Sequence, residues 1–219
     1  MPIRRTNKNN QKKWLKENSH LKILDLGSTH VNYWREANHF ADIVDYSEHF
    51  KKLNLPYTQI IPNEDLPFKD KEFDYVICSH VLEHVPDPFK LKKEIERIGK
   101  AGYIELPTKL NDNTVFGCDE EVLGHKWWFE FDDDKQNLVF AKKIDALEKF
   151  LSVGSIFKLI DIFQDSFILQ FYWSDTIPMA KREPFVLDKK ITFLTLVKKF
   201  YSKKIRQFFS NIKKKIFKQ

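Results

Sequence analysis

The chain has 219 residues, 42% of them hydrophobic, so it can bury the core of one domain with extensions but is too short for two large domains. Eleven of the 37 lysines and arginines lie in residues 189–219, which contain no aspartate or glutamate, so the remainder carries 26 basic against 31 acidic residues. The basic excess therefore belongs to the C-terminal segment, and the acidic remainder disfavours nucleic acid as a partner.

The cysteines and the N-terminal residues favour a cytoplasmic location. Cys78 lies in a predicted strand and Cys118 in a loop, and neither has a Cys-x-x-Cys partner, so we expect reduced thiols and no disulfide framework. Residues 1–20 are basic and are expected to form a helix or an arm, and no apolar stretch of the signal-peptide kind follows them. No run of apolar residues reaches the length of a membrane span.

The first predicted strand, residues 22–26, is followed by a tight turn. Gly27, Ser28 and Thr29 let the chain turn into a helix that is predicted to begin near Val31. A strand, a turn and a helix in this order are the usual start of a nucleotide-binding βαβ unit.

Two further strands end in polar side chains. Residues 41–44 form a predicted strand that ends at Asp45, where a carboxylate can accept hydrogen bonds from both hydroxyls of a ribose. Residues 73–78 are almost continuously apolar, which is typical of a parallel strand covered on both faces. Four polar residues follow this strand, namely Ser79, His80, Glu83 and His84. Open α/β sheets bind ligands at such strand ends.

The next helix and strand complete the predicted parallel sheet. The apolar residues Leu91, Ile95 and Ile98 lie on one face of the helix, which ends at Gly99. The strand that follows covers residues 102–106 and includes Glu105.

The second half of the chain predicts antiparallel additions. Residues 126–131 and 138–141 flank an acidic turn and are expected to form a hairpin, and residues 144–151 have helical spacing. Residues 166–173 are predicted to be a strand, and 175–184 a linker. We expect Trp127, Trp128 and Phe129 in the hairpin to be core or cover residues in preference to a stacking platform for a sugar or base.

Residues 189–219 predict a basic amphipathic helix. Seven apolar residues recur at steps of three or four and form one stripe: Leu194, Val197, Tyr201, Ile205, Phe208, Ile212 and Ile216. Lysines flank this stripe, an arrangement typical of an element that binds an anionic membrane surface.

Four motifs in this order carry a resemblance to a known family: ILDLG, VDYS, LPFKDKEFDYVICSHVLEHVPDP and ERIGKAGYIELP. Together they resemble a class I S-adenosylmethionine-dependent methyltransferase of the type 11-like subgroup, over roughly residues 21–140. The later GHKWWFEFDDDKQNLVFAKK is similar to members associated with bacterial surface-glycan synthesis. The resemblance implies a Rossmann-like, doubly wound, mostly parallel α/β sheet with late antiparallel strands or a hairpin. We therefore expect a methyltransferase-like domain over 21–175, a linker over 176–188 and an amphipathic tail over 189–219.

The resemblance also implies S-adenosylmethionine as the cofactor. Thr29 and Val31 stand where the family has its second and third glycines, and Pro62 where it has an acid for the adenine amino group. The residues expected at the cofactor are Asp25, Gly27, Ser28, Thr29, Asp45, Tyr46, Asn63, Glu64 and Ser79.

His80 is the first candidate for the base that removes the proton of the methyl acceptor, because an imidazole titrates near neutral pH; His84 and Glu105 are alternatives. A subset of similar methyltransferases binds a metal through an acid-x-x-Glu-His motif and a distant histidine, which makes His125 a further candidate ligand. His80 replaces the first acid of that motif, so we expect no metal and favour a capping network or a substrate wall.

The predicted function is methyl transfer to an oxygen, in preference to a nitrogen, of a small or glycan-type acceptor at the inner membrane surface. Two alternatives stay open. The first is a non-catalytic scaffold or binding protein with a degenerate methyltransferase fold. The second is an RNA methyltransferase recruited by the basic tail.

Overall fold

A computed structural model describes residues 3–114, 124–143, 164–183 and 192–216. A seven-stranded sheet has the order β1-β9-β6-β5-β2-β3-β4, and a second sheet has the order β10-β8-β7. The strands are β1 Ile3–Arg5, β2 Ile23–Leu26, β3 His39–Asp42, β4 Tyr57–Gln59, β5 Phe73–Ser79, β6 Gly99–Pro107, β7 Trp127–Asp132, β8 Asn137–Lys142, β9 Ile168–Ser174 and β10 Met179–Lys181. The helices are α1 Lys8–Glu17, α2 Ser47–Lys52, α3 Pro88–Ile98, α4 Lys109–Thr114, α7 Gln164–Phe167 and α8 Phe193–Ile216.

The large sheet is parallel at its centre and antiparallel at one edge. Strands β6, β5, β2, β3 and β4 pair in parallel, whereas β9 pairs antiparallel with β6 and β1 antiparallel with β9. The predicted mostly parallel α/β fold with late antiparallel strands is therefore confirmed. The predicted hairpin is confirmed as well, because β7 and β8 pair antiparallel through the turn that joins them.

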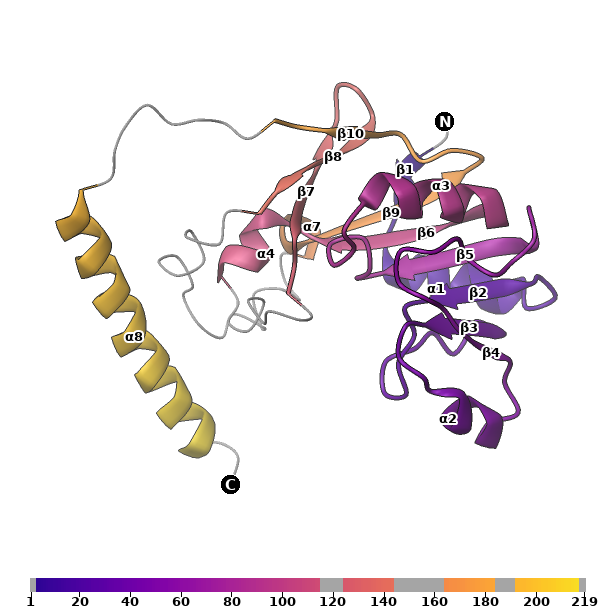
Figure 1. Ribbon diagram of the computed structural model, residues 1–219, viewed down its shortest axis with the longest axis horizontal. Coiled ribbons are helices and arrows are strands. Elements are labelled where there is room, and N and C mark those ends of the chain that lie inside the picture. Colours follow the sequence, from indigo (N-terminus) through magenta and orange to yellow (C-terminus); the bar gives the residue numbers. More distant parts are fainter. Residues whose placement is uncertain (1–2, 115–123, 144–163, 184–191, 217–219) are drawn as a thin grey trace.

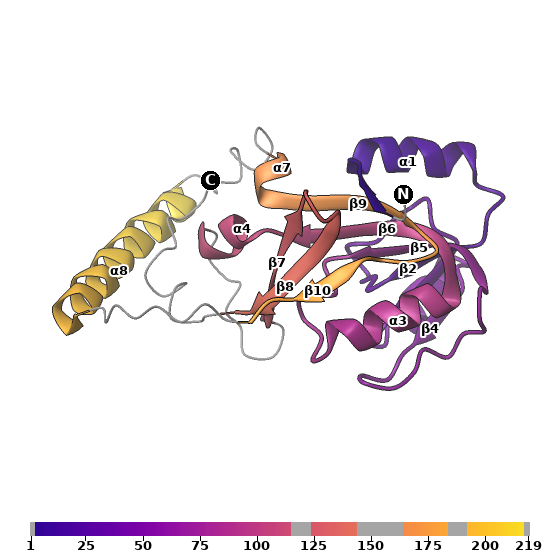
Figure 2. The same ribbon diagram turned by 90° about the horizontal axis from the view of Figure 1, so that it is seen from above.

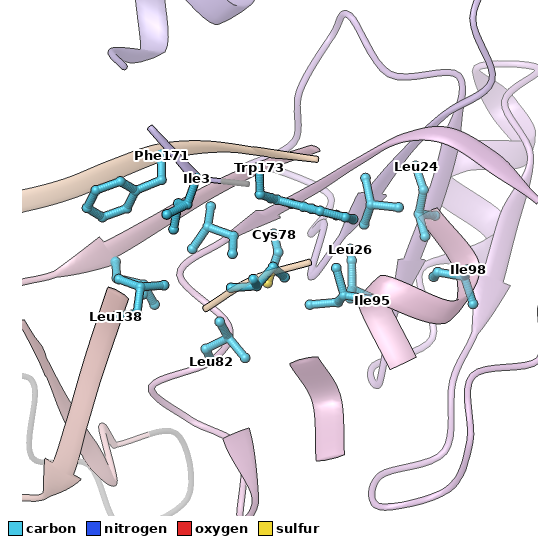
Figure 3. Close-up of a cluster of buried hydrophobic side chains, with 14 of the residues drawn as sticks. Ile3, Leu24, Leu26, Cys78, Leu82, Ile95, Ile98, Leu138, Phe171 and Trp173 are labelled. Atoms are coloured by element: carbon cyan, nitrogen blue, oxygen red, sulfur yellow. The ribbon is translucent and has the colours of Figure 1, made fainter. Parts of the chain in front are cut away.

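Both faces of the central strands are buried. In β5, Val76 and Cys78 point into a core that includes Ile95 and Ile98 of α3, whereas the alternate residues of β5 point into the opposite core. Figure 3 shows the first of these cores, in which Trp173 of β9 lies among the aliphatic side chains. Figure 2 shows α1 and α3 on opposite faces of the sheet. This double burial is the reason that the strand sequences are almost continuously apolar.

The prediction of a helix that begins near Val31 was wrong. Residues 28–38 form turns and bends, and Val31 is 79% exposed. The Thr29 hydroxyl accepts a hydrogen bond from the backbone N–H of Asn32 (3.0 Å), and the buried Asp25 carboxylate accepts one from that of Trp34 (2.7 Å). The backbone N–H of Thr29 also donates to the carbonyl of Asn32 (3.0 Å), which is the reverse of the helical direction, so the loop has a non-helical conformation.

The strand predicted at residues 41–44 lies two residues earlier. Asp42 ends β3 because its carboxylate accepts the backbone N–H of Val44 (2.8 Å), which turns the chain away from the sheet. Ile43 and Val44 are each 46% exposed, so their apolar character does not mark strand residues here.

The chain ends differ in part from the prediction. β1 makes the N-terminal segment part of the sheet, with Ile3 fully buried, while α1 matches the predicted helix. The expected linker over 176–188 contains β10, which pairs in parallel with β8, and the buried Ile177. The predicted C-terminal helix is present as α8, which lies away from the two sheets in Figures 1 and 2. The helical spacing of 144–151 and the position of Cys118 lie outside the described residues.

Candidate active site

The carboxyl ends of β2, β3, β4, β5 and β6 meet at one edge of the sheet, because these neighbouring strands run in parallel. Of the twelve residues predicted for cofactor binding or catalysis, nine lie in the loops that leave this edge. The other three, Asp25, Ser79 and Glu105, lie in β2, β5 and β6. The topology therefore gathers the predicted residues at one edge, as expected for an open α/β sheet.

Gly27 brings the backbone close to the loop after β5. Its φ is +89°, and a Cβ added there would lie 2.3 Å from Cγ2 of Val81. Only glycine fits this conformation and this contact without strain. Beside it, the hydroxyl of Ser28 is buried and has no hydrogen-bond partner within the described part of the chain. A glycine cradle next to an orphaned hydroxyl is a suitable place for a polar ligand group.

Asp25, at the end of β2, binds the backbone of this loop. It is 3% exposed, and its carboxylate accepts the backbone N–H of Trp34. Burial raises the pKa of Asp25 to about 7, against the lowering effect of the Trp34 hydrogen bond. Asp25 therefore acts on the loop backbone, and Thr29 likewise bonds within the loop.

Asp45 is exposed and lies three residues beyond the end of β3. One carboxylate oxygen accepts the backbone N–H of Ser47 (2.9 Å), and hydrogen bonds from the hydroxyl and the backbone of Ser47 lower the pKa of Asp45. Asp45 is therefore ionised at neutral pH and open to solvent. The next residue, Tyr46, precedes α2, and its ring lies 5.2 Å from that of His30.

The loop after β4 contributes polar and apolar groups. Asn63 has a φ of +66°, its carbonyl accepts a hydrogen bond from Nζ of Lys90 (2.7 Å), and both Asn63 and Glu64 are exposed. Ile61 in this loop is 61% exposed. Together with the exposed Val31 and Val44, it gives the loops of this edge apolar side chains that face solvent.

His80 follows β5 and is held between two carboxylates. Its Nδ1 lies 3.2 Å from Oε1 of Glu83, and its Nε2 lies 3.2 Å from Oε1 of Glu105. Burial alone would lower the pKa of His80, but the hydrogen bonds with Glu105 and Glu83 outweigh it and raise the pKa to about 10. His80 is thus protonated at neutral pH and cannot accept a proton. This protonation state argues against the role of general base that the sequence predicts for His80, which stays a prediction.

Glu105 is the acceptor at the centre of this network. It is 4% exposed and receives hydrogen bonds from four side chains: Lys8 (3.0 Å), Ser79 (3.1 Å), Tyr103 (2.5 Å) and His80 (3.2 Å). Burial favours the neutral acid, but the hydrogen bond with His80 and the charge of Lys8 outweigh burial and lower the pKa of Glu105 to about 2. Glu105 therefore stays ionised and is a weak base, contrary to its predicted role as an alternative catalytic base.

Sequence reasoning missed Lys8. This residue lies at the start of α1, and its ammonium group also lies 5.2 Å from the ring centroid of Trp34. The pairing of β1 with β9 brings Lys8 to a site built from residues about a hundred positions later. Its spacing in the sequence carries no signal of that contact.

His84 lies in a second cluster beside His80. Its ring is 4.6 Å from that of His125, and Nδ1 of His125 lies 2.8 Å from Oδ1 of Asp112. The segments that carry these residues are joined, because the backbone N–H of Lys126 donates to the carbonyl of Glu83 (2.7 Å).

The aromatic run in β7 packs as predicted. Trp128 is 5% exposed and Phe129 is fully buried. Trp127 is half-buried, and its indole N–H donates to the carbonyl of Val85 (2.8 Å). The run is therefore core and cover, as the sequence predicts.

A cavity lined by seven residues lies away from the strand ends, beside β1 and α1; its lining is Arg4, Arg5, Thr6, Asn10, Gln11, Trp14 and Tyr172. None of these residues was predicted to belong to the site. We place the candidate site at the strand ends and not in this cavity, because Gly27, Ser28, Asp45 and the His80 network are all there.

Residues 24–104 match the methyltransferase domain family. The matched segment, which is less than half of the chain, is similar to a methyltransferase domain. This match includes most of β2 and all of β3, β4 and β5 with their loops, and it supports the resemblance to an S-adenosylmethionine-dependent methyltransferase. The glycine cradle at Gly27 and the ionised Asp45 at adjacent strand ends suit this cofactor.

Several curated proteins are similar to parts of the chain. A tRNA U34 carboxymethyltransferase of Campylobacter curvus is 28% identical over 128 residues, which is 58% of this chain and 40% of that protein. An uncharacterized protein of Methanocaldococcus jannaschii is 46% identical over 106 residues (48% and 50%), and a demethylmenaquinone methyltransferase of Staphylococcus carnosus is 28% identical over 113 residues (48% and 46%). The chain thus spans about half the length, or less, of these relatives.

Solved structures align with a larger share of the chain. A putative methyltransferase from Bacillus halodurans aligns with 76% of this chain and 99% of its own, with a TM-score of 0.44 and 14% identity. A methyltransferase from Aquifex aeolicus aligns with 74% of this chain and 88% of its own, with a TM-score of 0.39 and 15% identity.

Proposed function

We propose that this protein transfers the methyl group of S-adenosylmethionine to an oxygen, in preference to a nitrogen, of a small or glycan-type acceptor. The observation that carries the proposal is the pair formed by the Gly27 cradle and the exposed Asp45, which lie after adjacent strands within the matched methyltransferase domain. In this proposal the backbone at Gly27 and Ser28 approaches the cofactor, and Asp45 accepts hydrogen bonds from its ribose hydroxyls.

The cofactor supplies a methyl group that its sulfonium already activates. The protein then has to hold donor and acceptor in line and at contact distance. His80 is a cation with both ring nitrogens directed at carboxylates, so it acts as a fixed hydrogen-bond donor within the wall of the site. We assign it a positioning role, in place of the proton acceptor predicted from the sequence.

Calorimetry with S-adenosylhomocysteine tests the cofactor site. Asp45→Ala should weaken binding by about 1.5 to 3 kcal/mol, as expected for the loss of hydrogen bonds to a charged group. Asp134→Ala, which removes an exposed aspartate in the β7–β8 turn, is the matched control and should leave the affinity unchanged. Failure of the intact protein to bind would instead support the non-catalytic scaffold.

An acceptor screen with labelled S-adenosylmethionine tests the reaction. Its arms are sugars and lipid-linked glycans, a quinol and transfer RNA, since similar proteins are named for demethylmenaquinone and tRNA. Label in an alkali-stable methyl ether of a sugar supports the proposal. Label in RNA alone would replace it with the RNA methyltransferase alternative.

We further propose that α8 holds the enzyme at an anionic membrane surface. Leu194, Tyr201, Ile205 and Phe208 on its apolar stripe are 57–65% exposed, and no acidic residue lies in 189–219. A bilayer interface would cover the stripe and attract the lysines at about 1 kcal/mol for each residue near the surface. No helix in the described parts of the chain is both long and apolar enough to span a membrane.

Vesicle co-sedimentation tests the role of α8. The full chain should bind vesicles rich in anionic lipid at low salt, less at high salt, and neutral vesicles least. A variant with Tyr201→Ser and Phe208→Ser should lose binding while keeping its affinity for S-adenosylhomocysteine. Absence of binding to anionic vesicles at low salt would refute the membrane proposal and leave the methyltransferase proposal intact.

A further inference from the structure

Three side chains, one of which also contacts His80, form a cluster with metal-ligand chemistry. Glu83, His84 and His125 each offer one ligand atom, and these atoms lie within 4.8 Å of one another. Two of the residues come from the loop after β5 and the third from the residues just before β7. One carboxylate with two imidazoles is a donor set that suits Zn²⁺ and related divalent transition ions.

The carboxylate of Glu83 has an oxygen that needs a partner. Glu83 is fully buried, and its Oε1 faces His80 at 3.2 Å. Its Oε2 is also buried and has no hydrogen-bond partner among the residues that the structure describes. A buried carboxylate oxygen without a partner is costly, and a cation would satisfy it while Oε1 keeps its bond to His80.

His125 is oriented as a ligand would be. Its Nδ1 lies 2.8 Å from Oδ1 of Asp112, a carboxylate that is 1% exposed. A carboxylate oxygen of Asp112 accepts in this pair, so Nδ1 of His125 is the donor and Nε2 keeps its lone pair. Nε2 is on the side of Glu83, 4.0 Å from Oε1. A carboxylate that fixes the tautomer of a histidine in this way is the usual outer-sphere partner of a metal ligand.

The backbone keeps the two segments together. The Glu83 carbonyl accepts the N–H groups of Lys126 and Trp127, at 2.7 and 3.3 Å, and the Trp127 indole donates to the carbonyl of Val85 at 2.8 Å. The ligand residues are thus held in place by contacts that do not need an ion. His80 does not belong to the set, because both of its ring nitrogens face carboxylates.

We propose that Glu83, His84 and His125 bind one divalent transition-metal ion, with Asp112 as the outer-sphere partner of His125. Zn²⁺ is the ion that this donor set favours. Three protein ligands leave a coordination position for water or for a substrate oxygen. The proposal rests on these contacts alone and does not require that the protein transfer methyl groups.

Titration with Co²⁺ tests the site directly, because tetrahedral Co²⁺ absorbs visible light. The full-length protein, first dialysed against a chelator, should bind one equivalent of Co²⁺ with visible absorption bands that Zn²⁺ then abolishes. Glu83→Gln and His125→Ala should lose these bands. His20→Ala, which removes an exposed histidine, and His80→Gln should keep them.

Asp112→Asn provides a milder test in case a ligand variant fails to fold. It should keep the stoichiometry and weaken Co²⁺ binding about 10- to 100-fold, as the loss of an outer-sphere partner does. Absence of Co²⁺ bands in the unmodified chain would overturn the proposal, and so would equal binding by Glu83→Gln, His125→Ala and Asp112→Asn. Affinity for S-adenosylhomocysteine, measured on the metal-free protein, reports separately on the proposed function.

Discussion

Asp25 should make the protein less stable as the pH rises from 4 to 7, and Asp25→Asn should remove this effect. Burial raises the pKa of the native carboxyl from 3.8 to about 7. The unfolded chain therefore releases this proton near pH 4, whereas the native state holds it up to about pH 7, so stability is lost across that interval. Each tenfold change in proton affinity corresponds to about 1.4 kcal/mol, which gives a loss of roughly 4 kcal/mol for the full interval.

Urea unfolding of both proteins between pH 3.5 and 8 measures this difference. Asparagine stays neutral and keeps an oxygen for the backbone N–H of Trp34, so the two proteins should be close in stability at pH 3.5. The advantage of Asp25→Asn should then grow with pH and level off above 7. Asp134→Asn in the β7–β8 turn controls for the loss of one exposed charge. A difference that does not change with pH would refute the argument that Asp25 is ionised at the expense of stability.

The remaining predictions concern the glycine cradle and the Glu105 network. Gly27→Ala should destabilise the fold by about 1 to 3 kcal/mol in urea unfolding, because an alanine would adopt a strained φ and collide with Val81. Adding Val81→Ala should recover part of this loss of stability. Full stability of the single variant would contradict the contact. Glu105→Gln should lower the free energy of unfolding by roughly 3 kcal/mol at pH 7, because the pKa of Glu105 is lowered from 4.5 to about 2. This loss of stability should shrink as the pH falls from 4.5 towards 2. A loss that is independent of pH would count against the ion pairs.

Most of the sheet was predictable because buried parallel strands have a distinctive sequence. The apolar residues of β2 and β5 mark strands covered on both faces, and α3 begins at the cap Asp87, which accepts backbone N–H groups, and ends before Gly99. The loop after β2 was not predictable by the same signals. Its conformation depends on the Asp25 carboxylate reaching Trp34, nine residues away, and hydrophobic periodicity does not report such a bond.

The structure brings the predicted site residues together at one edge of the sheet, but their protonation states do not follow from the sequence. Position in the sequence is enough to place His80 after β5 and Glu105 near the end of β6. Whether His80 accepts or donates a proton depends on the charges around it, and one of the two carboxylates comes from a neighbouring strand. The assignment of His80 as a base rests on the reference pKa of an isolated imidazole, which leaves these charges out.

Lys8 shows how the N-terminal segment takes part in the site. Without Lys8, the network around Glu105 would keep one cation, His80, for the two carboxylates Glu83 and Glu105. With it, the two buried carboxyl groups have two basic partners, and such pairing is the condition for keeping carboxylates out of water. β1 pairs with β9 at the edge of the sheet, and α1, which follows β1, carries Lys8 to Glu105. The N-terminal segment therefore supplies both the edge strand and one of the charges of the site. Residues 3–17 are therefore better described as a part of the α/β domain than as an arm attached to it.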